Sequence, residues 1–168
     1  MAKIASHVTW QGYPPEKLLQ ERFHIVTDFH PGQREIIEQL VQGRRILAIQ
    51  RTGWGKSLLY QVSSLYYPHL TIVFSPLKAL VRDQCQRCNT VYAIPSAILS
   101  SDFTAQENRV TLERAEANEL KLLFITPERL SSVLWQRVVS LAWLSLMRLI
   151  VSRCGAMTSV LIINVLQN

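Results

Sequence analysis

The sequence has few cysteines, no apolar leader and no unbroken apolar run long enough to cross a membrane. Its three cysteines, Cys85, Cys88 and Cys154, are too few to build a disulfide framework. Residues 1–20 mix polar and apolar side chains and so lack the apolar segment of a secretory signal. The longest apolar stretch, residues 133–151, is interrupted by one glutamine and two arginines. These absences predict a cytoplasmic protein that does not span a membrane.

Glycine and proline are also scarce, and this excludes a low-complexity or disordered chain. The 168 residues include 6 glycines and 7 prolines, and 48% of the residues are hydrophobic. That composition supports one globular domain, whereas the length is short for a two-domain motor. Lysine and arginine outnumber aspartate and glutamate by 18 to 12, giving a net charge of +6. The excess favours an anionic partner such as a nucleotide, a nucleic acid or a membrane surface.

Short apolar runs alternate with helical patterns along the chain. Unbroken runs rich in branched residues are typical of parallel strands buried on both faces; they occur at residues 46–49, 70–74 and 122–125. Helices are predicted after Pro14, from Pro31 to Gly43, and after a capping box formed by Thr104 and Glu107. This alternation predicts an α/β fold with a doubly wound, mostly parallel sheet, whose ligands bind at the carboxyl ends of the strands.

The segment Gln50–Ser57 reads Gln-Arg-Thr-Gly-Trp-Gly-Lys-Ser and has the pattern of a phosphate-binding loop. It follows the predicted strand at residues 46–49 and opens a helix, so its backbone N–H groups can surround phosphates. In such a loop Lys56 reaches the β- and γ-phosphates, and the Ser57 hydroxyl ligates Mg²⁺. Gln50 stands where the strict pattern has glycine. The strand before and the helix after favour a phosphate loop over a chance Gly-Lys-Ser turn.

Four segments in order resemble the motifs of one enzyme family. They are Phe29–Gln33, Thr52–Ser57, Ser75–Gln84 and Thr126–Leu130. The series resembles the first RecA-like domain of the RecQ family of superfamily 2 helicases, which are ATP-dependent 3′-to-5′ DNA helicases. The resemblance covers roughly residues 16–135 and implies a RecA-like P-loop NTPase fold. It also implies ATP and Mg²⁺ as cofactors, and single-stranded DNA, or a duplex with a single-stranded tail, as partner.

The resemblance assigns roles to individual positions. ATP-binding residues are Gln33, which reads the adenine edge, and Thr52, Gly53, Trp54, Gly55, Lys56 and Ser57, with Ser57 also holding Mg²⁺. DNA-binding residues are Ser75, Pro76, Lys78, Arg82, Gln84, Ser100, Thr126, Pro127, Glu128 and Arg129. Lysine and arginine with small hydroxyls at a sheet edge suit a phosphate backbone. His30 departs from the family, which usually has arginine there.

The remaining candidates for special chemistry favour structural roles. Cys85 and Cys88 have metal-like spacing but no second pair, so packed thiols are favoured over a zinc site. The four histidines show no ligand spacing. Trp54 is bulky for a phosphate loop, and we expect it to pack beside the nucleotide site.

No catalytic residue is identifiable, because the acidic pair of this family is missing. A RecA-like ATPase needs an aspartate for Mg²⁺ and a glutamate to activate water at the end of a strand. In RecQ helicases the pair lies in Asp-Glu-Ala-His, followed by Trp-Gly-His-Asp-Phe-Arg-Pro. The corresponding place here is near residue 145, yet no aspartate or glutamate follows Glu128.

A shift of reading frame explains this absence. Joining the last base of each codon to the first two of the next allows Asp-Glu-Ala-His from Leu146 onward, and Met157 followed by Thr158 forces an aspartate. The same shifted frame allows the aromatic-rich motif, except that the residue before its tryptophan is confined to Leu, Met or Val. Our hypothesis is that the native frame is lost between Ser140 and Leu146.

The predicted organisation is therefore a lead-in at residues 1–30, a partial first RecA-like domain at 31–145, and an aberrant tail at 146–168 that leaves the fold C-terminally incomplete. Residues 141–151 can still form a strand by composition, whereas 158–166 are expected to be an exposed, β-prone tail. We expect a helicase fragment that does not hydrolyse ATP. The alternatives are a superfamily 2 RNA helicase fragment and a non-catalytic module that binds ATP or nucleic acid.

Overall fold

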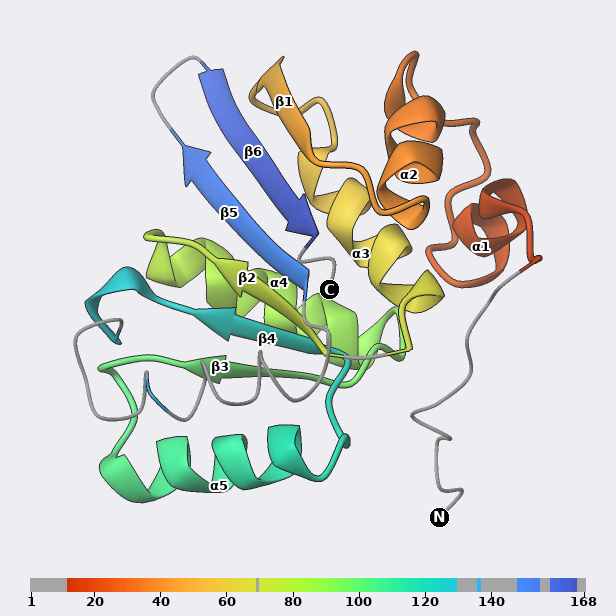
Figure 1. Ribbon diagram of the computed structural model, residues 1–168. Helices are drawn as coiled ribbons and strands as arrows, with labels where there is room; N and C mark the ends of the chain where they lie inside the picture. Colours follow the sequence, from red (N-terminus) through yellow and green to blue (C-terminus); the bar gives the residue numbers. More distant parts are fainter. Residues whose placement is uncertain (1–11, 69, 130–135, 137–147, 155–157, 166–168) are drawn as a thin grey trace.

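The computed structural model describes residues 12–68, 70–129, 136, 148–154 and 158–165 (Figure 1). Its helices are α1 (Pro15–Glu21), α2 (Gln33–Val41), α3 (Lys56–Tyr66), α4 (Lys78–Thr90) and α5 (Ala105–Glu116), with a 3₁₀ turn η1 (Pro127–Arg129). Its strands are β1 (Ile46–Arg51), β2 (Thr71–Phe74), β3 (Ser96–Leu99), β4 (Leu122–Ile125), β5 (Arg148–Cys154) and β6 (Thr158–Val165). The predicted strands at 46–49, 70–74 and 122–125 are confirmed as β1, β2 and β4, and the predicted helices as α1, α2 and α5.

The strands form one sheet in the order β1-β6-β5-β2-β4-β3. β2 pairs in parallel with β4 and with β5, and β3 pairs in parallel with β4. β6 is antiparallel to both of its neighbours, β1 and β5, so β1 runs in the same direction as β2 to β5. The α/β, mostly parallel fold is therefore confirmed. Because five described strands run the same way, their carboxyl ends meet at one edge of the sheet.

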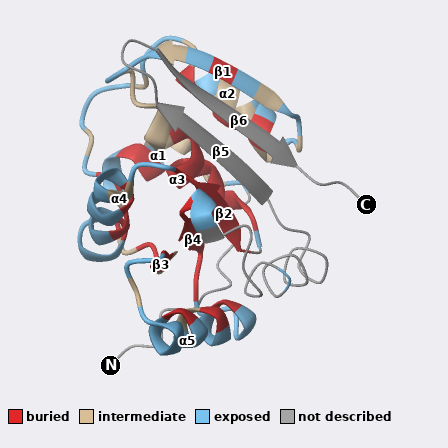
Figure 2. Cartoon of the chain, turned by 90° about the vertical axis from the view of Figure 1, so that its left-hand side faces the viewer, coloured by how far each residue is buried: buried red, intermediate tan, exposed pale blue. Residues whose placement is uncertain are grey.

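Helices cover the sheet on both faces. Residues from α1 to α4 share a core with Val73 and Phe124, whereas α5 packs with Ile72 and Phe74 on the opposite face. Val73 and its two neighbours in β2 thus point to opposite faces, as alternation along a strand requires. Figure 2 shows the buried residues of β2, β4 and α3 between these layers. Within the described residues, no helix is both long and apolar enough to cross a membrane.

The start of α5 is set by local chemistry. The Thr104 hydroxyl accepts a hydrogen bond from the Glu107 backbone N–H at 3.2 Å, and the Glu107 carboxylate accepts one from the Thr104 N–H at 2.8 Å. This reciprocal pair satisfies two N–H groups that a helix end otherwise leaves unpaired. The predicted capping box is confirmed.

Residues 158–165 do not form the exposed tail that the sequence predicts. They form β6, which lies inside the sheet between β1 and β5 (Figure 1). Only residues 155–157 separate β5 from β6. A parallel crossover needs a dozen or more residues, so the two strands can pair only in antiparallel fashion. The apolar, β-branched composition that predicted an exposed, β-prone tail is instead used in pairing within the chain.

Candidate functional site

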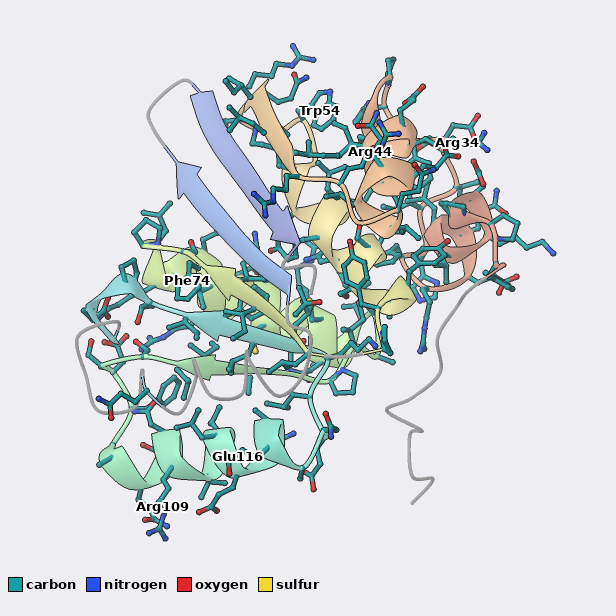
Figure 3. The ribbon with its side chains drawn as sticks, viewed as in Figure 1. Arg34, Arg44, Trp54, Phe74, Arg109 and Glu116 are labelled. Atoms are coloured by element: carbon teal, nitrogen blue, oxygen red, sulfur yellow. The ribbon has the colours of Figure 1, made fainter. Side chains whose placement is uncertain are left out.

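The loop between β1 and α3 has the backbone shape of a phosphate-binding loop. Gly53 and Gly55 have φ angles of +84° and +88°, in the left-handed region that other residues rarely adopt. Gly55 caps α3, whose first residue is Lys56. The N-terminus of α3 therefore opens at the carboxyl edge of the sheet, where a helix dipole and free N–H groups favour an anion. Figure 3 shows the Trp54 side chain beside β1 and α2.

The Lys56 side chain folds back along this loop. Its Nζ donates hydrogen bonds to the carbonyl oxygens of Gln50, at 2.7 Å, and Arg51, at 2.6 Å. These bonds hold the ammonium group against the loop that precedes α3. Lys56 therefore lies against the loop, and its contact with a phosphate stays a prediction.

Gln33 ties the start of α2 to the same loop. Its Oε1 accepts a hydrogen bond from the His30 backbone N–H at 2.9 Å, and its Nε2 donates to the Trp54 carbonyl at 2.8 Å. The residue is 1% exposed. Both ends of the amide have backbone partners, and the second lone pair of Oε1 is the acceptor left for an adenine edge, the role predicted for Gln33. The structure adds a role that the sequence did not predict, the bracing of the phosphate loop.

A cavity of about 300 Å³ lies beside the loop, and Phe29, His30, Gln33, Gly55, Ser57 and Gln84 contribute to its lining. Two motifs distant in sequence therefore meet around one hollow. Trp54 is partly buried against the core, and its ring approaches within 3.9 Å of a Cβ position built on Gly32. It lies between the loop and the start of α2.

Ser57, the predicted Mg²⁺ ligand, is held by α4. Gln84 Nε2 donates a hydrogen bond to Ser57 Oγ at 2.8 Å, and Gln84 Oε1 accepts one from the Tyr60 hydroxyl. Burial raises the pKa of Tyr60, so its hydroxyl remains a donor at neutral pH. The sequence predicted that Gln84 binds DNA, but the structure turns its side chain toward the phosphate loop.

Charged side chains from three strand ends form an exposed network. Lys78 Nζ lies 2.7 Å from Asp102 Oδ1 and 3.3 Å from Glu128 Oε1, and Arg82 Nη2 lies 2.6 Å from Asp102 Oδ2. Ser101 Oγ donates to Glu128 at 2.9 Å. The network joins the residues after β2, β3 and β4 at the carboxyl edge. Asp102 was not predicted, although a charged residue directly after a strand at this edge was a signal for it.

The network fixes the ionisation of its carboxylates. The hydrogen bond from Lys78 holds the pKa of Asp102 below its ordinary value. Burial opposes ionisation of Glu128, but hydrogen bonds from its own backbone N–H, Thr126, Ser101 and Lys78 together lower its pKa to about 2. Both carboxylates are therefore charged at neutral pH and compete with any phosphate for Lys78 and Arg82.

Other predicted DNA-binding residues divide between buried and exposed positions. Ser75, Ser100 and Thr126 are at most 5% exposed. Thr126 Oγ1 donates to the Leu99 carbonyl, and Ser100 Oγ accepts from the Asp102 N–H, so these hydroxyls brace the loops. Pro76 and Pro127 are exposed. The backbone of Arg129 ends the η1 turn.

The thiols pack as predicted. Cys85 and Cys88 are buried on α4, and burial raises their pKa values to about 11 and about 12. No group of His, Cys, Asp or Glu side chains that could hold a metal occurs in the part of the chain that the structure describes. Both thiols are thus protonated members of the core at neutral pH.

Strand β5 lies parallel to β2, so its end at Cys154 reaches the same edge as the phosphate loop. A carboxylate at that end would face the nucleotide site, but the segment Arg148–Cys154 contains neither aspartate nor glutamate. Among the described residues, the loop before α3 has the shape of a phosphate-binding loop, whereas β5 brings no carboxylate to this edge.

Comparison with known proteins identifies relatives of this chain. The family model for DEAD/DEAH box helicases matches residues 30–152. The ATP-dependent DNA helicase RecQ of Pasteurella multocida is 32% identical over 138 residues, which are 80% of this chain and 22% of that protein. RecQ of Synechocystis sp. is 38% identical over 104 residues, 62% of this chain and 22% of that protein. The probable ATP-dependent DNA helicase RecS of Bacillus subtilis is 34% identical over 111 residues, 66% of this chain and 22% of that protein. The chain spans about a fifth of the length of these relatives.

Proposed function

We propose that the chain binds ATP and single-stranded DNA at one edge of its sheet. The premise is that the chain belongs to the DEAD/DEAH box helicases and, within them, to the RecQ family. The observation that supports this most directly is the meeting of the phosphate loop and the Lys78 network at that edge. Both depend on parallel strands whose carboxyl ends coincide.

The nucleotide is bound by the loop and α3. Backbone N–H groups of the loop and Lys56 receive the phosphates, while Gln33 and His30 line the cavity beside them. Ser57 Oγ fits Mg²⁺, because this ion takes one or two protein oxygens and completes its shell with phosphate and water oxygens. The chemistry that Mg²⁺ would supply there is neutralisation of the phosphate charge.

Single-stranded DNA is bound at the ends of β2, β3 and β4. Lys78 and Arg82 lie where they can contact successive phosphates of the strand. Their ion pairs with Glu128 and Asp102 must break before these contacts form. The hydroxyls of Ser100 and Thr126 keep the loops in place instead of touching the strand, and Ser75 is buried beside them through its backbone bond to Ile125. The relatives named above are DNA helicases, which favours DNA over RNA as the substrate.

Turnover is absent because the acidic pair is absent. Without a glutamate to orient water and an aspartate for Mg²⁺, the loop binds the nucleotide but does not activate hydrolysis. We attribute the loss to a reading-frame shift before residue 146, which is consistent with a β5 that reaches the right edge without a carboxylate. The coding DNA sequence tests this, since a shifted frame that cannot encode the acidic motif rules it out.

Three measurements on the purified chain test the proposed function. A fluorescent ATP analogue with Mg²⁺ should bind saturably, and Lys56→Ala should weaken it roughly ten- to hundredfold through loss of a charge-assisted contact. A labelled oligodeoxynucleotide should bind more tightly than RNA of the same sequence. Phosphate release should stay at background with DNA present. Turnover that Lys56→Ala abolishes, or failure to bind either ligand, would contradict the proposal.

A further inference from the structure

Helix α4 contacts both halves of the proposed site. Its first turns contain Lys78 and Arg82, which belong to the exposed charge network, and Gln84 lies on the same helix with its side chain at the phosphate loop. Lys78 and Gln84 are six residues apart, a rise of about 9 Å along an α-helix. The buried residues Val81 and Cys85 fix the helix against the core between them.

The Gln84 amide has a partner at each of its two ends. Its Nε2 donates to Ser57 Oγ at 2.8 Å, and its Oε1 accepts from the hydroxyl of Tyr60, one turn further along α3. Tyr60 is 2% exposed, and its ring meets Phe124 edge-on with centroids 6.3 Å apart. Gln84 thus connects a buried core residue to the hydroxyl of Ser57, which would hold Mg²⁺.

This arrangement restricts the orientation of Ser57. One lone pair of its oxygen receives the Gln84 N–H, and this leaves the other lone pair for a metal. Hydrogen-bond partners of this kind orient metal ligands and tune their affinity. Any shift of Ser57 toward a bound Mg²⁺ pulls on Gln84 and so on α4.

We propose that Gln84 is a positioning residue that couples occupancy of the Mg²⁺-nucleotide site to the placement of Lys78 and Arg82 on DNA. This inference rests on the proposed function. Because coupling between two sites is reciprocal, the nucleotide changes DNA affinity by the same factor as DNA changes nucleotide affinity. Lys78 and Arg82 lie in the first turns of the same helix, so a shift of α4 changes their placement relative to Asp102.

The experiment compares DNA affinity with and without nucleotide. Fluorescence anisotropy of a labelled oligodeoxynucleotide gives Kd alone and at saturating Mg²⁺ with a non-hydrolysable ATP analogue. In the unchanged chain the two Kd values should differ by roughly 5- to 150-fold, the usual range of coupling. In Gln84→Leu the ratio should fall to about one. A residue that only stabilised the fold would alter both Kd values and leave their ratio unchanged.

Gln86→Leu is the matched control, because Gln86 is the same residue type, on the same helix, and exposed; it should keep the full ratio. Tyr60→Phe removes one hydroxyl, which orients Gln84 and also contacts Ser57, and should reduce the ratio even if Gln84→Leu does not fold. Retention of the full ratio in both Gln84→Leu and Tyr60→Phe overturns the proposal, as does a ratio of one in the unchanged chain when both ligands bind. Failure of the unchanged chain to bind either ligand would instead refute the proposed function.

Discussion

Gly53 and Gly55 share a backbone conformation but differ in the space around them. Their φ angles are +84° and +88°, and both favour glycine for that reason. A Cβ at Gly53 would meet no atom within 4 Å, whereas a Cβ at Gly55 would lie 2.5 Å from Gln33 Nε2. The bracing of the loop by Gln33 therefore depends on the missing side chain of Gly55.

Replacing each glycine by alanine separates these two effects. Gly53→Ala should lower the free energy of unfolding by about 1–2 kcal/mol, the cost of a left-handed backbone. Gly55→Ala should cost at least about 1 kcal/mol more, because Gln33 must move. Urea denaturation measures both values. Equal losses in the two variants would show that Gln33 does not hold the loop closely.

Lys121 is a buried cation at the start of β4. It is 7% exposed, and its Nζ donates to the Tyr67 carbonyl. Burial lowers its pKa from 10.5 to about 8. In the unfolded chain the group keeps its ordinary pKa, so between pH 8 and 10.5 the unfolded state binds more protons than the folded state, and stability rises with pH across this interval.

A comparison with Lys121→Met isolates this contribution, because the tyrosines and cysteines titrate in both proteins. From pH 7.5 to pH 10.5 the unchanged chain should gain roughly 2–3 kcal/mol of unfolding free energy relative to the variant. Denaturant titrations at several pH values give this difference. A gap that stays constant with pH would mean that Lys121 is well solvated.

At this scale the sequence pattern located the loop before α3, whereas the directions of side chains on α4 had no local signal. Lys56 and Ser57 follow from a pattern, because their chemistry is fixed by spacing within one loop. Gln84 was grouped with Lys78 as a DNA contact, since both fall in one motif. Residues on one helix can point to different surfaces, and only packing decides which, so the Ser57 contact of Gln84 could not be predicted.

At the scale of the elements, ion pairs connect the segments that follow β2, β3 and β4. Asp102, after β3, contacts both Lys78 and Arg82 of α4. Exposed ion pairs contribute little stability, so the proposed function gives this network another role. In that proposal Asp102 is a reversible counterion, and DNA phosphates replace its carboxylate at Lys78 and Arg82.

Asp102→Asn removes that competitor. It should tighten binding of single-stranded DNA roughly two- to fivefold at low salt and steepen the salt dependence. Glu113→Gln is the control, since it changes the net charge equally but pairs with Arg109 within α5. Figure 3 shows Arg109 on the outer side of that helix. If both variants gain affinity equally, net charge alone is responsible and the network has no specific role.

Elements with a local signal were predictable, and their pairing was not. The capping box located the start of α5, and unbroken apolar runs located β1, β2 and β4. Thr158–Val165 has the same apolar, β-branched character, so the sequence indicated a strand but not its neighbours. Its place between β1 and β5 depends on a gap in the sheet, which is a property of the whole molecule.

For the molecule as a whole, β6 decides whether the sheet is continuous. It pairs with β1 from Ile46 to Arg51 and with β5 from Arg148 to Cys154. β1 precedes the phosphate loop, while β5 adjoins β2, the strand before the charge network. The two halves of the proposed site are thus joined within the sheet through β6, and through α3 and α4 on one of its faces.

Removal of residues 158–168 should therefore separate the sheet. The unpaired backbones of β1 and β5 would become exposed edges, which favour association between chains. We expect the shortened chain to lose its cooperative denaturant transition and to elute as aggregates in size-exclusion chromatography. Removal of residues 166–168 alone should change neither, because β6 ends at Val165. A monomeric, cooperatively folding chain without residues 158–168 would mean that β1 and β5 close the gap themselves, and that the antiparallel strand is dispensable for the fold.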